Sequence, residues 1–201
     1  MKIFYSLIIM LITTISYADQ KAITDTGEEI FIYSDGTWKY NNNKNIFNKP
    51  KDSSFLLKST KNKSSFWVNV KKWSFSKNKS HDEDKEYDFR LKGKDLYGMA
   101  ITEEIEVPLE VLPDIALSNA QEAEGAGADI KILKREYRTV NGKKVLYMEM
   151  GGTMSGIKFT YLGYYYSDTY GTTQFIVFTA TNLVDKYKSE INRFLNGLDT
   201  Q

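Results

Sequence analysis

Apolar and polar positions alternate along most of the chain after residue 64, and their period predicts which segments are strands and which are helices. A period of two predicts strands at 66–70, 73–75, 87–91, 96–103, 130–140, 144–150, 157–167 and 173–180. Helical spacing predicts helices over about 110–124 and 183–196. The last strand is apolar on both faces, which is typical of a central strand. This order predicts an α+β fold in which helices pack on an antiparallel sheet.

Turn residues divide these segments. Asn141-Gly142 is the strongest hairpin signal in the chain, because both central positions of a type I′ turn need a positive φ. Gly151-Gly152 and Tyr170-Gly171 are predicted to form the next two turns of a four-strand meander.

The first third of the chain has a different composition. Residues 19–40 predict a small β-hairpin module with turns at 25–27 and 34–36. Residues 41–63 are rich in Lys, Asn and Ser and predict a flexible linker. The main antiparallel domain is then expected over 64–201.

The first eighteen residues, MKIFYSLIIMLITTISYA, are typical of a signal peptide. Lys2 provides the positive charge, an apolar run follows, and small residues lead to expected cleavage after Ala18. A membrane anchor is the alternative, but a spanning helix needs about 20 apolar residues and this run is shorter. The chain contains no cysteine, so a lipoprotein and disulfides are excluded. These features predict a periplasmic or secreted bacterial protein.

Charge is balanced overall but unevenly distributed. Between Lys39 and Lys79 there are eleven lysines and one acid, Asp52. Weak attraction of 39–79 to anionic polymers or lipid is one interpretation, and a solvated linker is the other. We expect no nucleic-acid partner, because nucleic acid is unlikely outside the cytoplasm and the segment has no aromatic platform pattern.

The main domain resembles the Mog1/PsbP-like family of small exported bacterial proteins over about 66–198. The resemblance rests on the edge strand with Trp73, on MAITEE at 99–104 followed by a proline-initiated helix, on VNGKKV at 140–145, and on a tyrosine-rich strand followed by Gly-x-x-Gln-Phe at 171–175. It implies an α/β/α sandwich around a central antiparallel sheet. It also implies a binding or accessory role without catalysis, and it carries over no functional residue.

Residue types that support catalysis or metal binding are scarce. His81 is the only histidine and lies in an acidic loop, so we expect no Ser–His pair and no metal or cofactor site. Glu103, Glu104 and Glu106 form no pair suited to glycoside hydrolysis, and acids before a helix favour its dipole. The segment 151–158 lacks the contiguous Gly-Lys-Ser/Thr of a phosphate loop.

Tyrosines gather in the strand at 157–167. Side chains alternate between the two faces of a strand, so odd-numbered and even-numbered positions lie on opposite faces. We therefore predict that Tyr161 and Tyr165 face the larger core, that Tyr164 and Tyr166 lie on the other face, and that Tyr170 lies at the turn. Tyr164, Tyr166 and Tyr170 are therefore the candidate surface residues for binding a partner, although aromatic residues also favour strands for packing alone.

Three functions fit these patterns. The first is a non-enzymatic binding or accessory protein that contacts another envelope protein. The second is a carrier of lipid or a small ligand, with a pocket between the sheet and the helices. The third and most remote is a carboxylate-based hydrolase.

Overall fold

The computed structural model describes residues 20–24, 29–40, 46–78, 85–125, 129–154 and 156–200. The predicted signal peptide at 1–18, the turn at 25–27 and His81 lie outside these residues. No helix within the described ranges is long and apolar enough to cross a membrane.

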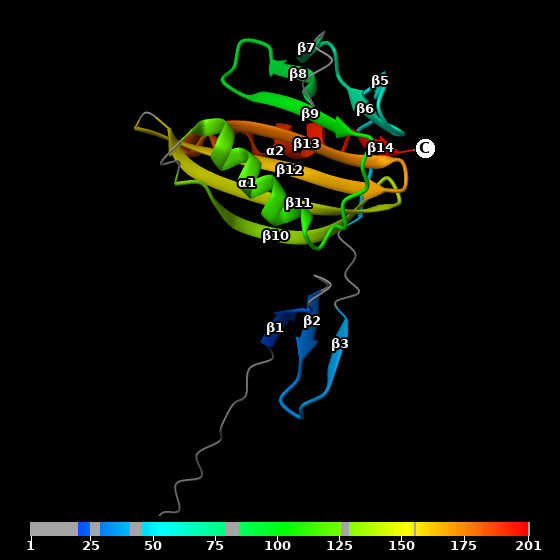
Figure 1. Cartoon of the computed structure of the whole chain (residues 1–201), viewed down its shortest axis with the longest axis vertical. Coiled ribbons are helices and arrows are strands. Elements are labelled where there is room, and N and C mark those ends of the chain that lie inside the picture. The colour runs from blue at the N-terminus through cyan, green and yellow to red at the C-terminus, as the bar shows by residue number, and fades with distance from the viewer. Residues whose placement is uncertain are drawn as a thin grey trace, which may run out of the picture.

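The described part of the chain contains an eight-stranded sheet in the order β4-β10-β11-β12-β13-β9-β8-β7 (Figure 1). Its strands are β4 (Ile46–Phe47), β7 (Trp73–Lys77), β8 (Lys85–Leu91), β9 (Tyr97–Glu103), β10 (Lys131–Val140), β11 (Lys143–Met154), β12 (Ile157–Asp168) and β13 (Gly171–Ala180). All neighbours pair antiparallel except β4, which runs parallel to β10. The prediction that β13 is a central strand is confirmed.

Helices and a second sheet cover the two faces of the large sheet, so the α/β/α sandwich is confirmed. Helix α1 (Leu112–Glu124) packs on one face, over β11, β12 and β13. Helix α2 (Val184–Leu195) packs on the other face after a short 3₁₀ turn, η1 (Thr181–Leu183). The same face is covered by a three-stranded sheet in the order β14-β6-β5, made of Leu198–Thr200, Ser64–Val68 and Phe55–Lys58.

Of the three predicted meander turns, two are confirmed and one is wrong. Asn141 and Gly142 have φ of 48° and 82° between β10 and β11, and Gly171 follows the turn after β12. Gly151 and Gly152 instead lie inside β11, which continues to Met154. A Cβ there would lie 2.8 Å from Leu133 and 2.9 Å from Ile130 respectively, so these glycines permit close packing of the neighbouring segment.

The N-terminal module is a separate three-stranded antiparallel sheet of β1 (Gln20–Ile23), β2 (Glu29–Ile32) and β3 (Trp38–Tyr40). The turn at 34–36 has the expected chemistry, since Asp35 accepts a hydrogen bond from the Thr37 N–H at 2.8 Å and Gly36 has φ of 81°. Its strands pair only with one another among the described residues.

The linker predicted over 41–63 is wrong from Ile46 onward. Strand β4 extends the large sheet, and β5 pairs with β6. Burial explains the difference, because Phe47 packs against the core and Leu57 is buried within it. Two short apolar islands in a polar segment are enough to fix the backbone when partner strands are present.

Candidate functional site

A cavity of about 250 Å³ lies between α1 and the face of the sheet that α1 covers. Its floor is formed by apolar side chains of three strands, Met99 and Ile101 of β9, Ile176 of β13 and Met150 of β11. Methionine side chains are flexible and polarizable, so such walls adapt to ligands of different shape. The cavity is an apolar concavity of the kind that binds small molecules.

Small residues on α1 create this space. Leu112 and Ala116 are 1% and 3% exposed and seat the first turns of the helix on the sheet. Further along the helix, Ala120 and Ala123 line the cavity. A methyl group at these positions is too short to fill the distance that a leucine would bridge. The sequence does contain this signal, since the alanines recur at helical spacing.

One polar side chain in the cavity wall is almost completely buried. Gln174 of β13 is 5% exposed, and its amide has no hydrogen-bond partner among the described residues. The preceding residue, Thr173, points to the opposite face, where its hydroxyl accepts a hydrogen bond from Asn62 Nδ2 at 3.0 Å. The amide atoms of Gln174 are not among the fully buried polar atoms of the described residues, so they are accessible from the cavity and available to a ligand.

Charged groups line the cavity at Lys85 and Glu103. The Lys85 ammonium lies 3.3 Å from a carboxylate oxygen of Asp88, and both side chains are well exposed. The sequence prediction examined Glu103 only as a catalytic carboxylate and did not place it near a cavity. In the structure it lies at the end of β9 beside this site.

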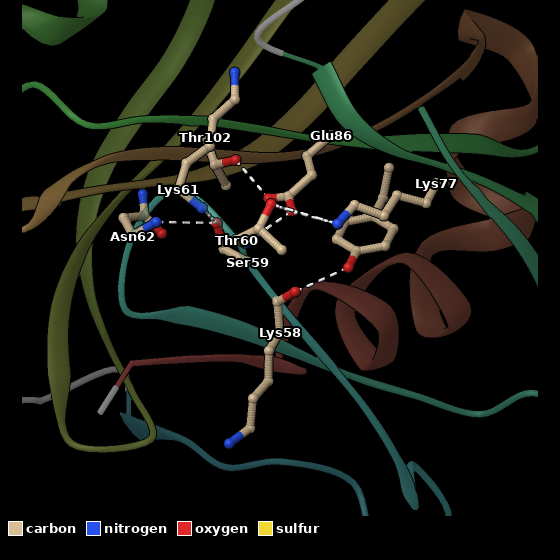
Figure 2. Close-up of polar contacts among 9 residues, drawn as sticks. Lys58, Ser59, Thr60, Lys61, Asn62, Lys77, Glu86 and Thr102 are labelled. Atoms are coloured by element: carbon tan, nitrogen blue, oxygen red, sulfur yellow. Dashed lines mark hydrogen bonds and ion pairs between the residues drawn. The ribbon is translucent and has the colours of Figure 1, made fainter. Parts of the chain in front are cut away.

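A second polar cluster surrounds Glu86, a buried carboxylate at the start of β8 (Figure 2). One oxygen accepts hydrogen bonds from the N–H and the hydroxyl of Thr60, both at 2.8 Å. The other accepts from the Thr102 hydroxyl at 2.7 Å. Lys77 Nζ lies 3.6 Å from the first oxygen. Burial alone would raise the pKa of Glu86, but hydrogen bonds from Thr102, Ser59 and Thr60 lower it below its ordinary value.

This cluster is a structural latch. Glu86 ties the turn after β5 to the large sheet. Asn62 of the same turn donates from Nδ2 to the Thr172 carbonyl at 2.9 Å. Tyr87 adds a hydrogen bond to the Lys58 carbonyl at 2.8 Å. Because Glu86 remains ionised and both its oxygens are engaged, it is suited to fixing the turn and not to transferring protons. The sequence prediction did not identify Glu86.

The tyrosine prediction is wrong for Tyr164. This side chain is 0% exposed, because α2 and the smaller sheet cover the face of β12 that was expected to be partly open. Its hydroxyl donates to Asn196 Oδ1 at 2.8 Å, and Arg138 donates to that hydroxyl at 3.3 Å. Tyr166 is half-buried and only Tyr170 is truly exposed, at 55%. Tyr165 is buried as expected, but the larger cluster of buried residues lies on the Tyr164 face.

Tyr164 belongs to a buried cluster around Arg138 that the sequence prediction missed. The guanidinium carbon lies 3.4 Å from the centroid of the Tyr147 ring, and its nitrogens donate to Glu136 at 2.7 and 2.5 Å. Burial by itself would lower the pKa of Arg138, but Tyr164 and Glu136 raise it above its ordinary value. The cluster joins β10, β11 and β12 to the end of α2.

One further expectation, for the acids before α1, can be compared with the structure. Helix α1 begins at Leu112, with Asp114 as the acid of its first turn, so Glu104 and Glu106 precede the helix and do not serve its dipole. Within the described ranges, no three His, Cys, Asp or Glu side chains are placed to hold a metal ion.

Known proteins show the fold class of this chain. No family model matches the sequence, and no curated protein matches it. The fold is similar to the solution structure of cyanobacterial PsbP (CyanoP) from Synechocystis sp. PCC 6803, with a TM-score of 0.57 and 14% identity over 76% of this chain and 95% of that chain. A Pseudomonas aeruginosa protein of unknown function is similar with a TM-score of 0.42 and 9% identity over 64% of this chain and 83% of that one. The likeness to cyanobacterial PsbP confirms a Mog1/PsbP-like fold, and at this identity it shows the fold alone.

Proposed function

We propose that this chain is an exported, non-enzymatic binding protein that takes a small, mainly apolar ligand into the cavity between α1 and the sheet. The observation that carries the proposal is the cavity of about 250 Å³ with methionine, isoleucine and alanine walls. Cavities of about 150 Å³ accept benzene, and drug-sized ligands use roughly 300–1,000 Å³. The ligand is therefore of one or two rings, or a short acyl chain.

A binding role agrees with the chemistry of the polar groups. Among the described residues, Glu86 is the buried carboxylate, and its hydrogen bonds engage it in the structural cluster away from the cavity. The charged side chains that line the cavity are Lys85, which pairs with Asp88, and Glu103. Export is supported by the leader at 1–18, whose pattern is that of a signal peptide.

The proposal is tested with 2-methylnaphthalene, an apolar two-ring probe, followed by its fluorescence and by saturation-transfer NMR. Ala120→Phe places a ring in the cavity and should weaken binding at least about tenfold, because the probe and the ring compete for one space. Ser118→Phe adds the same ring at an exposed position of α1 and should leave binding unchanged. Equal binding by wild type and Ala120→Phe would rule out the cavity as the site.

Contact with an envelope protein is the second candidate function, and Tyr170 favours it. Its ring is exposed at the turn between β12 and β13, and Lys63 Nζ lies 5.5 Å from its centroid. Tyrosine with a nearby cation is common in recognition surfaces. Tyr170→Ala should reduce recovery of a partner from an envelope pull-down, whereas Phe75→Ala, at another exposed aromatic residue, should not. Unchanged recovery with Tyr170→Ala would exclude this surface.

Attraction of 39–79 to anionic surfaces remains part of the second candidate. Several lysines of this segment already have partners in the fold. Lys72 Nζ lies 2.7 Å from Glu190, Lys77 is close to Glu86, and Lys49 lies 4.2 Å from the centroid of the Trp67 ring. The segment therefore offers less free positive charge than its composition indicates.

A further inference from the structure

The cavity has polar and apolar ends, and the register of the sheet defines them. Lys85, Ile101 and Gln174 are partners on β8, β9 and β13, and they form one row across the floor. Met99 and Ile176 form the next row on β9 and β13, and Asp88 is the partner of Met99 on β8. Met99 and Ile176 line the cavity and Asp88 does not, so a ligand that fills the cavity meets the amide of Gln174 on one side and these two apolar side chains on the other.

Gln174 combines a low residue exposure with an amide that is accessible from the cavity. Gln174 is 5% exposed, and no described residue hydrogen-bonds its amide. A structural glutamine in this position would have a protein partner, as Gln121 of α1 does when it donates to the Ile130 carbonyl at 2.8 Å. The amide that faces the cavity is instead positioned to bond whatever occupies it.

The chemistry of this group restricts what binds. An amide offers both a donor and an acceptor and carries no charge, so it pairs with a hydroxyl, a carbonyl or another amide. A charged ligand group beside it would lose its hydration without a buried counter-charge, which is unfavourable. Lys85 does not provide that counter-charge, because it is already 3.3 Å from Asp88 and remains well exposed. Glu103, the other charged residue of the cavity wall, already has an interaction partner as well.

We propose that the cavity selects ligands with a single neutral hydrogen-bonding group on a mainly apolar body, and that Gln174 is the residue that determines this specificity. The polar group meets Gln174, and the body lies against Met99, Ile176 and the alanines of α1. This inference rests on the proposed function, because it needs the cavity to hold a ligand. It goes further by naming the chemical class.

The test compares two probes of the same shape, 2-naphthol and 2-methylnaphthalene, which differ by a hydroxyl in place of a methyl group. The quantity measured is the ratio of their dissociation constants, in wild type and in Gln174→Met. Methionine has a similar length and no amide, so it removes the hydrogen bond and keeps the walls. We expect the preference for 2-naphthol to fall about tenfold in the variant, as one hydrogen bond predicts.

Met99→Leu is the matched control, because it changes the cavity wall at nearly constant volume and leaves Gln174 in place. Its ratio should equal that of wild type. If both probes bind and the ratio in Gln174→Met stays within about twofold of wild type, the specificity inference is wrong and the binding proposal stands. If neither probe binds wild type, the binding proposal fails and the inference fails with it.

Discussion

The carboxylate of Glu86 accepts two hydrogen bonds from Thr60, one from the backbone N–H and one from the hydroxyl, both at 2.8 Å. These two residues lie 26 positions apart and join the turn after β5 to the beginning of β8. A charged acceptor in a buried position makes such bonds stronger than neutral ones. The smaller sheet is thus fastened to the larger one at this point.

Replacement of Glu86 by glutamine should destabilise the protein by about 1–3 kcal/mol. The amide NH₂ of glutamine faces hydroxyl and N–H donors where the wild type has an acceptor oxygen. Chemical denaturation monitored by tryptophan fluorescence measures the loss. Asp88→Asn on the same strand is the control, and its exposed ion pair with Lys85 should contribute less than about 1 kcal/mol. Equal effects of the two substitutions would contradict the conclusion that the hydrogen bonds of Glu86 stabilise the fold.

The same latch predicts how stability depends on pH. The pKa of Glu86 is lowered in the folded state from its ordinary value of 4.5, so its contribution is fully present above that value. It is lost as the pH falls through the lowered pKa, because the protonated carboxyl accepts fewer hydrogen bonds. The difference in unfolding free energy between wild type and Glu86→Gln should be constant near neutral pH and should shrink below about pH 4.5. A difference that grows on acidification would be inconsistent with this assignment.

Gln174→Met should stabilise the ligand-free protein by up to about 1 kcal/mol, because it replaces an amide without a described partner by an apolar side chain at a position that is 5% exposed. Thr173→Val, at the neighbouring position, should have the opposite effect. The Thr173 hydroxyl is completely buried and contacts Ser64 Oγ at 2.6 Å and Asn62 Nδ2 at 3.0 Å. Thermal unfolding of both variants tests the contrast. Destabilisation by Gln174→Met would show that its amide serves the fold itself.

Tyr164→Phe should cost about 1–2 kcal/mol of stability, because it leaves Asn196 and Arg138 without the hydroxyl that they share. Tyr170→Phe, at an exposed ring, should change stability by less than about 0.5 kcal/mol. Denaturant titrations of the two variants compare them directly. An effect of Tyr164→Phe as small as that of Tyr170→Phe would argue against a structural role for the buried hydroxyl.

Export predicts that the mature protein begins at Asp19. Intact mass analysis of the protein secreted by, or extracted from the periplasm of, a bacterial host measures this directly. Ala18→Phe should prevent cleavage at that bond, because signal peptidase requires a small residue there. Retention of residues 1–18 in the exported wild-type protein would contradict cleavage after Ala18, and recovery of the protein only from the cytoplasm would overturn the export proposal.

Much of the fold is predictable from the sequence because the main strands and helices have clear periods. The helix at 183–196 corresponds to α2, and the hairpin at Asn141-Gly142 is present with the expected backbone angles. The strands β4 and β5, which replace the predicted linker, and the continuation of β11 through Gly151 and Gly152 are not predictable in this way. In both segments the outcome depends on partners that are distant along the chain, such as β10 for β4 and Leu133 for Gly151.

The candidate site shows the same division. Sequence parity correctly assigns Tyr164 and Tyr165 to opposite faces of β12, because side chains alternate on any strand. Whether a face is open or covered depends on where α1, α2 and the smaller sheet pack, and both tyrosines are in fact buried. The spacing of alanines on α1 and the presence of Gln174 are likewise visible in the sequence. That they enclose one cavity is a consequence of how far the helix stands from the sheet.

The sequence by itself determined the strands, the helices, most turns and the two-sided burial of β13, because these follow from local periodicity and backbone preferences. Only the tertiary structure decided the burial and the hydrogen bonds of individual side chains. Tyr164 is buried, Glu86 accepts hydrogen bonds from the turn after β5, and the amide of Gln174, which has no partner among the described residues, faces the cavity. Packing between distant segments sets these outcomes, since the burial and the hydrogen bonds of a side chain depend on neighbours that its own stretch of sequence does not specify.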